Sequence, residues 1–123
     1  TAIRHNSDKW KRKSEIIKRY TKAFYDTSVK FPKLAFQNKW NWYVMPIVVD
    51  DYEKTTTALR EAQIEYASHY KFPLHLENFA KQYNNHSCPN AEKLTGRIIS
   101  LPSHTHLTNK DIDYVIQTVI SSL

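Results

Sequence analysis

Residues 98–123 read IISLPSHTHLTNKDIDYVIQTVISSL, and this stretch predicts a short strand followed by a packed helix. The apolar run that starts at Ile98 ends at Pro102, which cannot continue a strand. Thr108, with Asp111 three residues later, is typical of a capping box at a helix start. Beyond this cap one apolar face is formed by Ile112, Val115, Ile116, Val119, Ile120 and Leu123. This face must pack against another part of the protein, so the segment indicates a core at the C-terminal end.

The first third of the chain predicts a basic amphipathic helix. From about Asp8 to Asp26 apolar residues recur at spacings of three and four, and Ser7 or Asp8 can cap the start. Residues 1–41 hold 11 Lys or Arg against 3 Asp or Glu, whereas residues 42–123 hold 7 against 9. The net charge of +6 is therefore concentrated where it suits phosphates, nucleic acid or an acidic protein face. A solvated helix face explains the same charges without a partner.

Between these two segments, short strands alternate with short helices. Residues 27–39 predict an irregular connection, and residues 40–51, rich in aromatic and β-branched side chains, predict a strand. Pro46 limits the pairing of that strand and indicates an edge or a bulge. The helix that follows is expected to begin with a capping box of Asp50 and Glu53.

The remaining elements complete an α+β pattern. The sequence predicts a strand at 64–70, a short helix at 76–83, a loop at 84–89 and a helix at 90–97. Helices separated by isolated strands indicate a small, mostly antiparallel sheet of about three strands, covered by helices. A length of 123 residues suits one domain. Within it, residues 1–38 are expected to be a basic linker-type helix and connection, and residues 39–123 a small α+β domain.

The composition argues against several classes of protein. No run approaches the roughly 18 apolar residues of a membrane span, so no membrane partner is expected. The first residues lack the apolar region of a signal peptide, and the lone Cys88 has no disulfide partner, so the cytoplasm is the expected location. Gly96 is the single glycine, which argues against glycine-rich phosphate-binding loops.

Several residues could carry chemistry, but their spacing does not favour it. The potential metal ligands are His69, His75, His86, Cys88, His104 and His106. Their spacings differ from the paired ligands of structural zinc sites, so no metal is predicted. A nucleophilic pair of Cys88 and a histidine has no specific signature here, and no catalytic residue is assigned. Trp10, Tyr20 and Tyr25 could stack on bases, but they fall largely on the apolar stripe, where core packing is favoured.

The stretch SHYKFPLH at 68–75 leaves two interpretations open. It could be a rigid aromatic loop in which Tyr70, Phe72 and Leu74 pack and the histidines cap nearby carbonyls. It could instead present His, Tyr and Lys side chains as hydrogen-bond donors to phosphates or sugars. The residues alone do not separate these alternatives.

Ordered motifs in the second half of the chain give a further indication. A His-Tyr-x-x-Pro-x-His loop is followed by a Pro-x-Ala-Glu helix, a Ser-Leu-Pro strand and a closing His-Leu-Thr-x-x-x-x-Asp-Tyr-Val-Ile helix. These motifs are carried by His69, Tyr70, Pro73 and His75; by Pro89, Ala91 and Glu92; by Ser100, Leu101 and Pro102; and by His106, Leu107, Thr108, Asp113, Tyr114, Val115 and Ile116. Their order resembles the C-terminal part of the DegT/StrS family of sugar aminotransferases. The resemblance covers residues 40–123, and the basic first helix corresponds to the long helix that joins the family's two domains.

This resemblance implies a role for the chain. The family consists of pyridoxal-phosphate (PLP) enzymes of the aspartate-aminotransferase fold that act on nucleotide-linked keto sugars, and this chain would be the C-terminal small domain, in a parent enzyme that is a homodimer. The SHYKFPLH loop would lie at the mouth of the active site, with His69, Tyr70 and His75 in contact with the nucleotide-sugar. The family's Schiff-base lysine lies upstream of the matched region, and no lysine here matches its motif. Without that nucleophile the chain alone is predicted to bind no cofactor covalently and not to catalyse transamination.

The sequence departs from the family at Gln63, Glu65 and Ala67, where glycines are usual, so the loop that follows could be aimed differently. Two other functions remain as alternatives. One is a non-catalytic module, derived from the same family, that binds a nucleotide-sugar or a protein. The weaker alternative is a basic nucleic-acid-binding domain.

Overall fold

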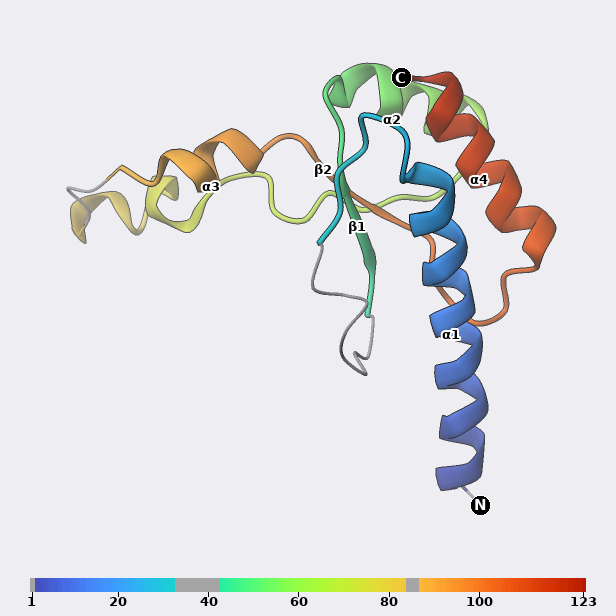
Figure 1. Ribbon diagram of the computed structural model, residues 1–123. Helices are drawn as coiled ribbons and strands as arrows, with labels where there is room; N and C mark the ends of the chain where they lie inside the picture. Colours follow the sequence, from blue (N-terminus) through green and yellow to red (C-terminus); the bar gives the residue numbers. More distant parts are fainter. Residues whose placement is uncertain (1, 33–42, 84–86) are drawn as a thin grey trace.

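The computed structural model describes residues 2–32, 43–83 and 87–123, which form a small body and an extended arm (Figure 1). The elements in chain order are α1 (Ala2–Phe24), β1 (Met45–Val48), α2 (Tyr52–Glu61), the 3-10 turns η2 (Leu74–Leu76) and η3 (Lys81–Tyr83), α3 (Pro89–Leu94), β2 (Ile98–Leu101) and α4 (Asn109–Ser121). The arm, defined as residues 70–83 and 87–94, carries η2, η3 and α3 away from the body. The predicted α+β class is confirmed. The predicted domain boundary at 38–39 lies outside the described residues.

The sheet is small and antiparallel, as predicted. β1 and β2 pair along their length, and single bridges join Lys30 to Val48 on one side and Ala67 to Ser100 on the other. The prediction of a strand at 64–70 is wrong. This segment is bridged to β2 at the single position Ala67 and then continues into the arm. Pro46 lies within β1, which in the described chain is bridged on its outer side only at Val48, so Pro46 occupies an edge. The predicted start of this strand, at 40–42, lies outside the described residues.

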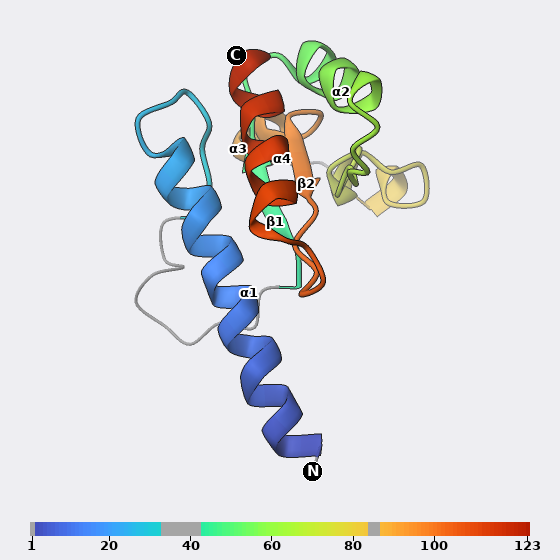
Figure 2. The ribbon, with the colours of Figure 1, turned by 90° about the vertical axis from the view of Figure 1, so that its right-hand side faces the viewer.

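One hydrophobic core holds the body together. Its buried members are Ile16, Ile17, Tyr20, Phe24, Val29, Met45, Ile47, Val49, Leu59, Ile99, Leu101, Ile112, Val115, Ile116 and Val119. Most of them come from α1, both strands, α2 and α4, and the helices α1 and α4 lie side by side in both views (Figures 1 and 2). The predicted C-terminal helix and its docking are confirmed, and Thr108 and Asp111 form the expected capping box. The apolar face extends less far than predicted, because Ile120 and Leu123 in the last turn are exposed.

Polar contacts fix α1 against the β2–α4 connection and α4. The Arg19 guanidinium donates two hydrogen bonds, of 2.7 and 2.6 Å, to the Asp113 carboxylate, and Arg12 donates to the Leu107 carbonyl at 2.6 Å. The buried Tyr20 hydroxyl donates to the Pro102 carbonyl at 2.9 Å. Two of the helix's cations are therefore used within the protein.

The predicted helix in the first third is confirmed, with corrections. It begins at Ala2, upstream of the predicted cap at Ser7 or Asp8, because no residue in this stretch breaks a helix. Tyr20 is buried as predicted, whereas Trp10 and Tyr25 are exposed, so core packing was the wrong expectation for those two.

In the middle of the chain, the start of α2 and the end of α3 also differ from the predicted positions. The cap of α2 is Asp51, whose carboxylate accepts the Lys54 N–H at 2.9 Å, because the predicted cap Asp50 pairs instead with Arg97. The predicted helix at 90–97 is α3, which ends at Leu94 because Gly96 has a φ of +75°.

The predicted helix at 76–83 is replaced by the 3-10 turns η2 and η3. Glu77 ends η2 with extended backbone. The apolar side chains of this stretch are exposed, and short helices need tertiary packing to be stable.

Candidate functional site

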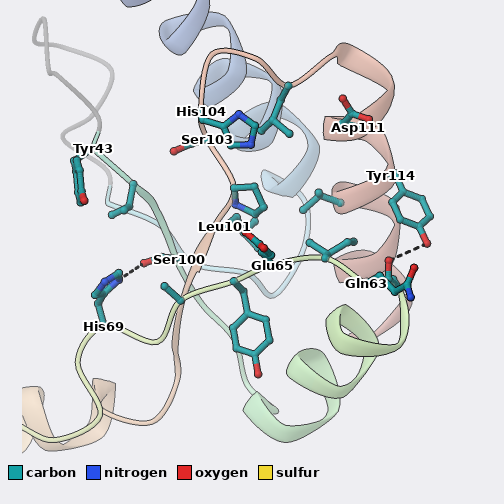
Figure 3. Close-up of a pocket in the computed structure, with 18 of the residues that line it drawn as sticks. Tyr43, Gln63, Glu65, His69, Ser100, Leu101, Ser103, His104, Asp111 and Tyr114 are labelled. Atoms are coloured by element: carbon teal, nitrogen blue, oxygen red, sulfur yellow. Dashed lines mark hydrogen bonds between the residues drawn. The ribbon is translucent and has the colours of Figure 1, made fainter.

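An open pocket of about 830 Å³ lies between residues 62–69, the β2–α4 connection and the first half of α4 (Figure 3). Its apolar lining includes Ile64, Leu101, Pro102, Leu107 and Val115. Its polar lining includes Lys13, Tyr43, Glu65, His69, His104, Asp111 and Tyr114. An apolar surface with a few polar groups is typical of a small-molecule site.

His69 is the predicted contact that the structure places at this pocket. Its Nδ1 lies 3.1 Å from the hydroxyl of Ser100, which is buried in β2 (Figure 3). The bridge between Ala67 and Ser100 fixes the backbone next to it. The imidazole therefore has a defined position relative to the sheet.

The charged groups of the pocket do not sum to a strong field of one sign. Lys13 donates from Nζ to the Tyr43 carbonyl at 3.0 Å, and burial lowers the pKa of its ammonium. Asp111 caps α4, and hydrogen bonds from Thr108, with a smaller effect of His104, lower the pKa of its carboxyl group. Glu65 adds a second carboxylate. Because one cation faces two anions, the pocket does not select an anionic ligand by charge alone.

Tyr70 and His75 lie away from the pocket lining, on the arm. Tyr70 is exposed, and His75 Nε2 lies 2.9 Å from Oε1 of Glu92. The same Glu92 oxygen accepts hydrogen bonds from the Cys88 N–H at 2.9 Å and the Ser87 hydroxyl at 3.2 Å. The contact with His75, and then that with Cys88, lower the pKa of the Glu92 carboxyl group. The structure therefore divides the three predicted contacts between the pocket and the arm.

The arm exposes most of its large apolar side chains. Tyr70, Phe72 and Leu74 are 80%, 62% and 70% exposed, so they do not pack against the described part of the chain as the rigid-loop interpretation required. Leu76, Phe79, Tyr83 and Leu94 are also exposed. Large apolar side chains that are exposed close together in the sequence are a feature of interfaces.

The other candidate chemistry receives no support in the described residues. No group of three or more His, Cys, Asp or Glu side chains there is arranged to hold a metal ion, and His86 lies outside the described part of the chain. Cys88 is exposed at the start of α3. None of the helices described has both the length and the hydropathy that crossing a bilayer requires.

Lys13, Tyr43, His104 and Tyr114 line the pocket, but sequence analysis did not identify them as site residues. They come from three separate parts of the chain, and no local pattern joins them. His104 had been considered only as a metal ligand. Its position between Pro102 and the Thr108 cap, in a loop that connects a strand to a helix, was the one available signal.

Comparison with known proteins identifies the family. The profile of the DegT/DnrJ/EryC1/StrS aminotransferase family matches residues 2–120. A DegT DnrJ EryC1 StrS aminotransferase from Brucella abortus is 30% identical and superimposes with a TM-score of 0.84, over 93% of this chain and 31% of that one. A putative sugar aminotransferase from Streptococcus pneumoniae, solved in its PLP-form, is 23% identical with a TM-score of 0.79, over 94% of this chain and 31% of that one.

A curated relative is also a transaminase. The dTDP-3-amino-3,6-dideoxy-alpha-D-galactopyranose transaminase of Aneurinibacillus thermoaerophilus is 21% identical over 108 residues, which are 88% of this chain and 30% of that protein. The chain thus spans about a third of the length of these relatives. Because the family profile matches almost every residue, the chain belongs to the DegT/DnrJ/EryC1/StrS aminotransferase family.

Proposed function

We propose that this chain is the C-terminal domain, as a fragment or a separate subunit, of a PLP-dependent aminotransferase that acts on nucleotide-linked keto sugars. The observation that carries the proposal is the match of nearly the whole chain to about a third of a solved family member, at a TM-score of 0.84. The domain would supply substrate contacts and help to close the active site. As for other enzymes that act on soluble nucleotide-sugars, the cytoplasm is the proposed location.

The cofactor would be held by a part of the enzyme outside this chain. We expect that the described residues do not make a PLP site by themselves. The N-terminus of α4, which could otherwise attract a phosphate, is occupied by the Thr108 hydroxyl and the negative Asp111 carboxylate. Lys13, the pocket lysine, is bonded to the Tyr43 carbonyl and matches no Schiff-base motif. No chemical step is therefore assigned to these residues.

His69, Tyr70 and His75 remain the proposed contacts to the nucleotide-sugar. His69 borders the pocket with its ring held by Ser100, which suits a directed hydrogen bond to a sugar or phosphate oxygen. Tyr70 is exposed at the base of the arm, where its ring is accessible to a ligand. His75 lies further along the arm, and it would reach the same ligand only if the substrate spans both places.

The apolar surface of the arm supports the idea of a missing partner. Phe72, Leu74 and Phe79 would be covered in the assembled enzyme, either by the cofactor domain or by the second subunit of a homodimer. The non-catalytic binding module is the second candidate, because the pocket and His69 suit binding with or without chemistry.

The first test is a titration of the pure chain with a dTDP-linked sugar, in which binding is measured by calorimetry and NMR. We expect binding that His69→Ala weakens and that the control His106→Ala, an exposed residue outside the pocket lining, leaves unchanged. Absence of binding, or equal binding by His69→Ala, would overturn the assigned contacts.

A second test separates the enzyme part from the module. The pure chain, mixed with pyridoxal phosphate, an amino donor and a keto-sugar nucleotide, should give no turnover, and turnover would refute the proposal.

Sequencing of the coding DNA upstream of Thr1 should reveal a cofactor domain with a Schiff-base lysine. If a start codon lies there instead, and no gene for a separate catalytic subunit exists, the binding module is correct.

A further inference from the structure

We propose that Glu92 is a positioning residue, which holds the substrate-facing loop at 68–75 in place by joining its far end to the start of α3. The inference rests on the proposed function, because it concerns the same loop. It adds a residue to which neither the motif analysis nor the pocket gives a role.

The geometry that carries the proposal converges on one oxygen atom. Oε1 of Glu92 lies 2.9 Å from His75 Nε2, 2.9 Å from the Cys88 backbone nitrogen and 3.2 Å from the Ser87 hydroxyl. His75 is in η2, whereas Ser87 and Cys88 immediately precede α3. The Glu92 carboxylate thus joins the start of α3 to a histidine 17 positions before Glu92, and hydrogen bonds to a charged acceptor are stronger than neutral ones.

Hydrophobic packing within the described part of the arm does not fix the loop. η2 and α3 contain no buried residue, so no hydrophobic core of their own holds them together. Hydrogen bonds such as Leu76 N–H to the Pro73 carbonyl join residues three apart, and so they shape a single turn. By contrast, Glu92 acts across the arm, and His75 is the better shielded partner, with a side-chain exposure of 13% against 36% for Glu92.

The charge of Glu92 suits this role. Its hydrogen bonds favour the ionised carboxylate, so it acts as an acceptor for all three donors at neutral pH. His75 must therefore carry a proton on Nε2, which fixes the tautomer of a neutral ring as well as its orientation. If His75 contacts the nucleotide-sugar, Glu92 determines which ring atom faces it.

The experiment compares Glu92→Ala and Glu92→Gln with wild type by amide hydrogen exchange and backbone NMR relaxation. Glu77→Gln is the control, because it removes a carboxylate from the same arm without removing any of the three contacts. We expect Glu92→Ala to speed exchange at the Cys88 amide and to increase the mobility of residues 70–76, while the control does neither. Glu92→Gln retains an acceptor for Cys88 but is not charged, so its effect should be smaller. Unchanged exchange and mobility in Glu92→Ala would overturn the proposal.

The affinity for dTDP-glucose then tests the functional part. Because both partners are partly solvent-exposed, we expect Glu92→Ala to weaken binding by roughly three- to tenfold and Glu77→Gln to leave it unchanged. Equal affinity of wild type and Glu92→Ala, with a mobile loop in the variant, would refute a positioning role. If the wild type does not bind the nucleotide-sugar at all, the proposed function fails, and the exchange measurement still decides whether Glu92 orders the loop.

Discussion

Replacement of Gln63 by glycine should stabilise the protein. The helix α2 ends in a Schellman motif, in which the Ile64 N–H donates to the Leu59 carbonyl at 2.9 Å and the Gln63 N–H donates to the Arg60 carbonyl at 3.0 Å. This motif puts Gln63 in the left-handed region, at a φ of +56°. Glycine adopts this conformation without a steric penalty.

The expected gain is the difference between two backbone effects. The left-handed conformation costs a residue with a Cβ about 1–2 kcal/mol, whereas glycine loses roughly 0.5–1 kcal/mol more conformational entropy on folding. Gln63 is exposed, so little packing is lost with its side chain. Gln63→Gly should therefore raise the free energy of unfolding by about 0.5–1 kcal/mol, which corresponds to a rise in Tm of about 2–5 °C for a chain of this size.

Thermal and urea unfolding, followed by circular dichroism, would measure this difference. The matched control is Ala62→Gly at the neighbouring C-cap, where a φ of −77° gives glycine no advantage and a loss of about 0.5–1 kcal/mol is expected. Variants with opposite signs at adjacent positions would confirm that the conformation of Gln63 is responsible. A Gln63→Gly variant that is destabilised as much as Ala62→Gly would refute the reasoning.

Three further predictions follow from the body of the protein. Tyr20→Phe removes the buried hydrogen bond to the Pro102 carbonyl and should lower the free energy of unfolding by about 1–2 kcal/mol in urea titrations. Leu59→Ala leaves a cavity in the core and should cost about 2–5 kcal/mol in the same assay. Hydrogen bonds, chiefly from Arg19, depress the pKa of Asp113 below its ordinary value of 3.8, so its stabilising contribution is present above that pH and is lost as the pH falls through the lower, folded-state pKa. Asp113→Asn should therefore reduce the fall in Tm that wild type shows between pH 5 and about pH 2.5; an unchanged acid dependence would contradict this.

The elements that could be predicted from sequence are those whose signals are local. The capping box of Thr108 and Asp111 and the helical spacing after it lie within one stretch, so α4 was predicted with its cap. At α2 two adjacent aspartates could each cap, and the choice depends on Arg97, which lies 47 residues away and pairs with Asp50. A local pattern cannot contain that information, and the predicted cap was therefore wrong by one residue.

The pocket could not be predicted either, because it is formed by residues that lie far apart in the sequence. Lys13 and Tyr43 meet because a lysine ammonium reaches a carbonyl 30 residues later, and His104 joins them because β2 pairs with β1. Of the three residues predicted to contact substrate, only His69 lies at the pocket. Its place depends on the bridge between Ala67 and Ser100, since the other two residues follow the chain into the arm.

The arm explains why apolar spacing predicted packing that the described residues do not provide. Leu76, Phe79 and Tyr83 have helical spacing, and Tyr70, Phe72 and Leu74 stand at every second position, which are patterns of side chains with one buried face. The pattern indicates that a partner surface exists but not that the surface belongs to the same chain. Here the body buries its own core, while the apolar residues of the arm remain exposed. An apolar pattern that is regular in sequence and exposed in structure is best explained by a surface outside the chain, and the proposed assembly with a cofactor domain supplies one.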